Sequence, residues 1–103
     1  MPSSAYAILR DAILQRLQVT ADYHSYLREF CPHVIGIKRG REHVLGYQFG
    51  GQSSSGLRAG GEWRCFDVAG LTNVGTYNGV WHTGNRNTQP QSCVDQIDVE
   101  VDY

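Results

Sequence analysis

The spacing of the apolar residues changes near residue 18, and this change limits the fold more than any other feature of the sequence. Over residues 8–17 apolar side chains recur every three or four positions, which is typical of an amphipathic helix. Over residues 19–23 apolar and polar side chains alternate, which is typical of a strand with one buried face. The sequence therefore predicts one helix over about residues 4–17 and a β-rich part over about residues 18–103.

About five short strands are predicted in the β-rich part. Pro32 disfavours a helix immediately before it, and the polar turn around Gly40 separates two extended runs, as in a hairpin. The predicted strands cover residues 19–23, 32–38, 44–49, 63–68 and 97–103, with a turn and a further short strand over 69–74. We expect an α+β, mostly β fold, in which the N-terminal helix precedes a small, strongly bent antiparallel sheet or SH3/Sm-like barrel.

The length and composition suit a single domain over residues 1–103, since the chain has 103 residues and 41% of them are hydrophobic. No apolar run reaches the roughly 18 residues of a membrane-spanning helix, and no signal peptide is recognised. We therefore expect a cytoplasmic protein with no membrane partner. Three cysteines, Cys31, Cys65 and Cys93, are too few for a secreted disulfide framework, so we expect free thiols.

The net charge of -1 conceals an uneven distribution along the chain. Residues 1–58 hold seven Lys and Arg against four Asp and Glu, a balance of +3, whereas residues 59–103 hold two against six, a balance of -4. Such a polarised chain favours a partner that approaches from one side.

The order of these features resembles the WYL domain, a small Sm-like or SH3-like β-barrel preceded by a helix. The resemblance covers about 60 residues and rests on Ala12-Ile13, on residues 19–23 and 32–36, on 42–47 at the place of the family's Trp-Tyr-Leu strand, and on 63–68 at the place of its Arg-x-Phe strand. It implies a domain that binds a small ligand or single-stranded nucleic acid and passes the signal to an attached module.

Arg64 is the residue we expect to contact an anionic ligand. An arginine between apolar strand residues needs a carboxylate or phosphate partner when it is partly buried. Trp63 and Tyr47, with Trp81 and Tyr77, can line a pocket for a planar ligand. The alternatives are core packing for the aromatic residues and a salt bridge from Arg64 to Asp67 or Glu62.

A basic cluster at the turn of the predicted hairpin completes the expected ligand-binding residues. Lys38, Arg39 and Arg41, next to His43, can contact phosphates of single-stranded nucleic acid. The alternative is a solvated surface turn. The Gly- and Ser-rich residues 50–61 can either ring an anion with backbone N–H groups or form a plain connection between strands.

The cysteines and histidines allow two further kinds of site. Zinc accepts thiolate and imidazole ligands, but the close ligand pairs of structural zinc sites are missing, so we expect no metal and no cofactor. A thiol enzyme needs a thiolate and a base within hydrogen-bond reach, for which Cys31 and His33 are the least implausible pair. The donors considered are Cys31, His33, Cys65, His82 and Cys93.

The sequence therefore favours a non-enzymatic, WYL-like binding or sensing module for an anionic small ligand or single-stranded nucleic acid. One alternative is a structural or interaction protein that acts through homo-oligomerisation, as a homodimer. A second alternative is a small thiol-dependent enzyme.

Overall fold

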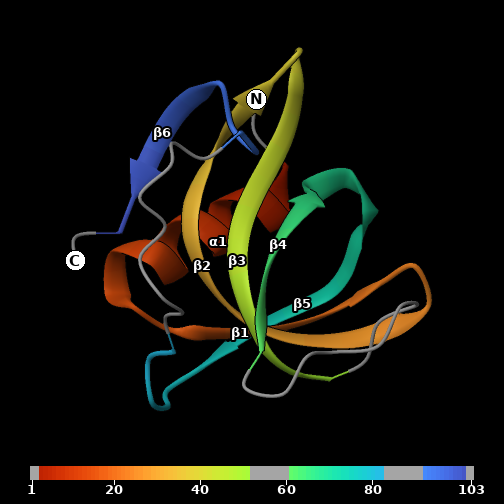
Figure 1. Cartoon of the computed structure of the whole chain (residues 1–103), viewed down its shortest axis with the longest axis vertical. Helices are drawn as coiled ribbons and strands as arrows, with labels where there is room; N and C mark the ends of the chain where they lie inside the picture. Colours follow the sequence, from red (N-terminus) through yellow and green to blue (C-terminus); the bar gives the residue numbers. More distant parts are fainter. Residues whose placement is uncertain (1–2, 52–60, 83–91, 102–103) are drawn as a thin grey trace.

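The computed structural model describes residues 3–51, 61–82 and 92–101. Within these ranges one helix precedes six antiparallel strands, so the expected α+β, mostly β class is confirmed (Figure 1). The elements are α1 (Ser4–Gln15), β1 (Gln18–Tyr23), β2 (Tyr26–Lys38), β3 (Arg41–Gly51), β4 (Glu62–Asp67), the 3-10 helix η1 (Val68–Gly70), β5 (Leu71–Tyr77) and β6 (Gln96–Glu100).

The long strand β2 organises the sheet, whose order is β4-β3-β2-β1-β5. One edge of β2 pairs with β3. The other edge pairs with β1 over residues 26–30 and with β6 over residues 34–37. The β2–β3 register shifts at two points, after Glu29 and after Pro32. Such irregularities bend a strand and increase its twist, and the sheet curves strongly in Figure 1.

Helix α1 ends two residues earlier than the apolar spacing predicts. Ser3 caps its start, where the Ser3 hydroxyl accepts a hydrogen bond from the Tyr6 backbone N–H at 3.2 Å. At the other end Arg16 takes a left-handed conformation with φ 54°, and the Leu17 N–H bonds back to the Ala12 carbonyl. Leu17 therefore lies outside the helix, although it still packs against the core.

The main core lies between α1 and the inner face of the sheet, which we define as the face that carries Phe30. The rings of Phe30 and Phe66 stack with centroids 4.6 Å apart, and both side chains are buried. Gly46 makes room for this stack, since a Cβ there would lie 2.6 Å from the Phe30 ring. The helix contributes Tyr6, Leu9, Ala12 and Ile13 to the core, and the strands contribute Val19, Ala21, Ile35 and Val44 among others.

A second, smaller apolar cluster lies on the outer face, where the residues that precede β6 cover the strands. It consists of Val34, Leu45, Cys93 and Val94. Strands β2 and β3 are thus packed on both faces, which explains the nearly continuous burial of residues 30–36.

Two of the three cysteines form a disulfide, so the expectation of free thiols is wrong for Cys65 and Cys93. Their Cα atoms lie 5.5 Å apart, which is within bridging range. The bond joins β4 to the residues before β6 across a separation of 28 residues, and sequence spacing does not reveal such a contact. Only Cys31 is a free cysteine among the described residues.

The disulfide also bears on the expected cytoplasmic location, which stays a prediction. Disulfides persist mainly in oxidising compartments and are rare in the cytosol, so this bond weighs against that location. None of the helical residues that the structure describes forms a segment long and apolar enough to cross a membrane.

Strand β2 starts six residues before the predicted one. His24 and Ser25 connect β1 to β2 as a two-residue turn, with left-handed φ values of 51° and 70°. Glycine or asparagine usually occupies such positions, so the sequence carries no turn signal there. Strand β3 extends to Gly51, and most of the Gly- and Ser-rich segment, residues 52–60, lies outside the described residues.

Candidate functional site

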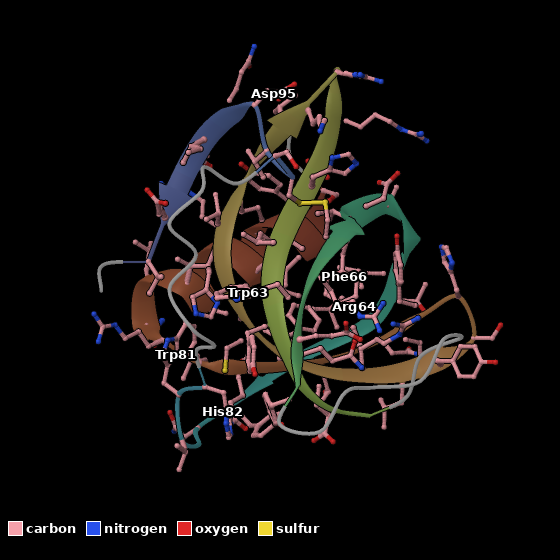
Figure 2. All side chains as sticks on the ribbon, viewed as in Figure 1. Trp63, Arg64, Phe66, Trp81, His82 and Asp95 are labelled. Carbon is pink, nitrogen blue, oxygen red and sulfur yellow. A yellow bond between two sulfur atoms is a disulfide. The ribbon has the colours of Figure 1, made fainter. Side chains whose placement is uncertain are left out.

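The residues expected to bind a ligand are distributed over three places. Lys38, Arg39 and Arg41 lie at the turn between β2 and β3, with His43 close by on β3. Tyr47 pairs with Trp63, whereas Arg64 pairs with Gly46. Since neighbouring strand residues point to opposite faces, Arg64 lies on the inner face, and Trp63 and Tyr47 lie on the outer face. Figure 2 shows Trp63 and Arg64 on different sides of the strands.

The basic residues at the hairpin turn mostly contact the chain itself. Lys38 donates a hydrogen bond to the Ser92 carbonyl, and Arg41 pairs with Asp67 at 3.7 Å. A ring nitrogen of His43, Nδ1, lies 3.2 Å from the carbonyl oxygen of Cys93. These contacts join the basic turn to β4 and to the residues before β6.

The aromatic residues of the outer face surround His33. The His33 ring lies 4.6 Å from the Trp63 ring and 4.9 Å from the Trp81 ring, and Trp63 also packs edge-on against Tyr47. His33 is completely buried, and burial lowers its pKa to about 4. The packing alternative therefore describes Trp63 and Tyr47 better than a ligand pocket does.

Cys31 lacks the surroundings of an activated thiol. Burial raises its pKa to about 11, and its sulfur accepts a hydrogen bond from the His82 backbone N–H at 3.3 Å. The Nδ1 atom of His33 lies 2.7 Å from the Cys31 carbonyl oxygen, a hydrogen bond with the backbone. A nucleophilic cysteine needs a lowered pKa and an adjacent base, so both groups are shifted in the wrong direction for thiol chemistry.

Arg64 forms the ion pair that the sequence offered as an alternative, with Glu62. The two side chains are 24% and 25% exposed, so the pair lies at the boundary between the interior and solvent. Glu62 and Arg64 are two residues apart on β4 and therefore share the inner face.

A second arginine lies on the same inner face, and sequence reasoning missed it. Arg28 is only 4% exposed. It donates hydrogen bonds to the Tyr23 carbonyl at 3.2 Å and to Gln48 Oε1 at 3.4 Å. Its guanidinium also lies over the rings of Tyr23 and Tyr26, at 5.4 and 5.9 Å from their centroids. We call Arg28, Gln48, Glu62 and Arg64 the inner polar cluster.

The charge of Arg28 has no carboxylate partner within the described part of the chain. No salt bridge to Arg28 occurs there, and its buried Nε atom makes no hydrogen bond. Burial lowers the pKa of Arg28, and the nearby charge of Arg64 lowers it further. Buried charges are ordinarily paired, because moving an ion out of water costs several kcal/mol. An anion near Arg28 would relieve both effects.

The sequence carries no local signal for the burial of Arg28. Residues 26–30 are Tyr-Leu-Arg-Glu-Phe, in which apolar and polar side chains do not alternate. Burial alternates over these residues only in the structure, where Arg28 shares the face of Phe30. The turn at His24 and Ser25, which starts the strand, is not marked in the sequence either.

Zinc ligation by the expected donors meets two obstacles. Cys65 and Cys93 bind each other, which removes them as thiolate ligands. In the three described ranges no group of three or more His, Cys, Asp or Glu side chains gathers as a metal site would require.

An open cleft of about 760 Å³ lies between the start of α1, the start of β3 and β6. Its carboxylates are already engaged. Glu42 accepts hydrogen bonds from the Ser3 backbone N–H at 3.1 Å and from the Ser3 hydroxyl at 2.7 Å. Asp98 accepts from the Tyr6 hydroxyl at 2.7 Å and pairs with Arg10 at 3.2 Å. These contacts attach α1 to the sheet and make the cleft a weaker candidate than the inner polar cluster.

No protein-family model matches the chain, and neither a curated protein nor a solved structure matches it. The resemblance to the WYL domain therefore stays a prediction.

Proposed function

We propose that this protein is a non-enzymatic binding or sensing module, similar to a WYL domain, whose ligand is a small anion held between Arg28 and Arg64. The observation that carries the proposal is the burial of the Arg28 guanidinium without a carboxylate partner among the described residues. A guanidinium offers five N–H donors in a planar arrangement that matches carboxylate and phosphate groups.

The surroundings of Arg28 support an anion rather than a neutral ligand. Two arginines and one glutamate give the inner polar cluster a balance of +1, and the repulsion between the arginines falls when a negative charge lies between them. The partial exposure of Arg64 gives a small ligand a way in from solvent. Gln48 and the Tyr23 carbonyl hold the Arg28 side chain in place before the ligand arrives.

We favour a small ligand over single-stranded nucleic acid. A nucleic-acid strand needs several cations along an exposed path, with aromatic rings between them. Lys38 and Arg41 contact the chain itself, and they lie at the β2–β3 turn rather than beside the inner polar cluster.

The proposal is tested by thermal unfolding of the protein with a panel of anions at constant ionic strength. The panel comprises chloride, acetate, inorganic phosphate, a nucleoside monophosphate and a short oligonucleotide. An anion that prefers the native state raises its stability by mass action, by about 2.7 kcal/mol at one hundred times its Kd. Arg28→Met should abolish this shift, and the exposed Arg10→Met should retain it as the matched control.

Two results would contradict the proposal. One is a panel in which every anion gives the same melting temperature as chloride. The other is an anion-dependent shift of equal size in the wild-type protein and in Arg28→Met. A shift given by the oligonucleotide alone would favour nucleic acid over a small ligand.

A further inference from the structure

We infer that Glu62 is an internal competitor for the ligand and that it makes the inner polar cluster selective for phosphate-type dianions over monocarboxylates. This inference rests on the proposed function. Its basis is a difference in ion pairing between the two arginines. A carboxylate of the chain pairs with Arg64, whereas none in the described residues pairs with Arg28.

The position of Glu62 allows it to compete directly. It lies on the same face of β4 as Arg64, and its register partner on β3 is Gln48, the residue that accepts a hydrogen bond from Arg28. An anion that contacts both arginines must therefore enter beside the Glu62 carboxylate. The Glu62 carboxylate repels an anion beside it, so the ligand has to displace Glu62 from Arg64.

The Glu62 side chain is able to move away from Arg64. This side chain is 25% exposed, and Glu62 stands at the first position of β4, directly after Gly61 with its φ of 99°. A carboxylate that turns out to solvent regains its hydration, so displacement exchanges one partly exposed ion pair for a ligand contact with two arginines. Partly exposed pairs contribute little net stability, which makes this exchange easy for a ligand of higher charge.

The competition sets the ligand class. Glu62 is attached to the same strand as Arg64, so its carboxylate acts at a high effective concentration. A free monocarboxylate such as acetate makes the same kind of contact with Arg64 and therefore does not displace Glu62. A phosphate group carries about -1.5 to -2 charges near neutral pH and three acceptor oxygens. It can therefore engage Arg28 and Arg64 together and compensate for the loss of the Glu62 contact.

The test measures the affinities of inorganic phosphate and of acetate by titration calorimetry in the wild type and in a set of variants. Wild type should bind phosphate more tightly than acetate. Glu62→Gln should bind both more tightly, phosphate by about tenfold, or about 1.4 kcal/mol, because the carboxylate that pairs with Arg64 is gone. Acetate should gain more than phosphate, so that the preference for phosphate narrows; an equal or smaller gain for acetate would contradict the selectivity assigned to Glu62. Glu100→Gln removes the same charge from the exposed strand β6 and should bind like the wild type.

A further variant, Glu62→Asp, separates the ion pair from the net charge. It keeps the charge, but its carboxylate is one methylene shorter, so its bond to Arg64 should weaken and the affinity for phosphate should rise. This variant also decides the question when circular dichroism shows that Glu62→Gln does not fold. Combining Glu62→Gln with Arg64→Met should remove the gain, because the competition acts through Arg64.

The outcomes distinguish this inference from the proposed function. If phosphate binds the wild type in an Arg28-dependent manner and Glu62→Gln and Glu62→Asp bind it no more tightly, the inference is wrong and the proposed function stands. If the Glu62 variants bind phosphate more weakly, Glu62 supports the site and the inference is again wrong. If phosphate and acetate bind none of the proteins, both fail together.

Discussion

His33 should make the stability of this protein depend on pH in a predictable direction. Its ring is completely buried between Trp63 and Trp81, and burial lowers its pKa from 6.5 to about 4. The unfolded chain, in which the ring is hydrated, retains the ordinary value and binds a proton first as the pH falls. Acid therefore favours the unfolded state, and the stability contributed by neutral His33 is present above pH 6.5 and lost between pH 6.5 and 4.

The size of this loss follows from the same shift. Each pKa unit corresponds to about 1.4 kcal/mol, so a decrease from 6.5 to about 4 corresponds to about 3 kcal/mol. A domain of this length is typically stable by about 5–15 kcal/mol. Protonation of one side chain is thus expected to remove a substantial part of the total free energy of unfolding.

Urea unfolding between pH 7.5 and 4, followed by tryptophan fluorescence, measures this dependence. His33→Gln removes the titrating group and should flatten the curve of free energy against pH by about 3 kcal/mol over that range. His24→Asn replaces an exposed histidine at a left-handed position that asparagine tolerates, and serves as the matched control variant. Equal pH slopes for wild type and His33→Gln would refute the reasoning, as would a His33 pKa near 6.5 measured by NMR.

Three further substitutions test the core, the disulfide and the inner polar cluster. Arg28→Met should raise the free energy of unfolding of the ligand-free protein by about 1 kcal/mol or more, and with it the melting temperature, because an apolar chain replaces a buried charge; calorimetry that shows a lower melting temperature contradicts this. Cys65→Ser should lower the free energy of unfolding in urea by about 3–4 kcal/mol, as expected for a loop of 28 residues, and dithiothreitol should affect only the wild type. Gly36→Ala should cost more than about 3 kcal/mol, since its Cβ would lie 2.0 Å from the Gln96 carbonyl oxygen; proteolytic resistance equal to the wild type speaks against it.

The sequence predicts the helix and the first strand well because both depend on local patterns. One face of each is buried, and the spacing of apolar residues reports that face directly. The errors occur at turns whose geometry has no glycine to mark it. Arg16 ends α1 in a left-handed conformation, and His24 and Ser25 turn the chain between β1 and β2 in the same region. Each error moves an element boundary and leaves the order of elements intact.

The charge polarity along the chain has a different meaning in the folded protein. It suggested a partner on one side, but the two halves of the chain pair with each other. Arg10 pairs with Asp98 and Arg41 with Asp67, and each pair joins the basic part to the acidic part. Only the placement of β6 and β4 brings these residues together, so the sequence alone could not show that the complement is internal.

Arg28 and His33 are both buried on β2, and the difference between them explains why we assign the ligand site to Arg28. Both lose hydration on burial, but they respond differently. A histidine becomes neutral at little cost near neutral pH, so His33 can be buried between two tryptophans without carrying a charge. An arginine stays protonated under the same conditions, so burial leaves its charge in place. Two hydrogen bonds and two aromatic rings compensate part of that charge, and an anion would compensate the rest. In the described residues Glu62 engages Arg64 instead. A ligand can therefore supply the negative charge that Arg28 lacks, and the competition with Glu62 decides which class of ligand binds.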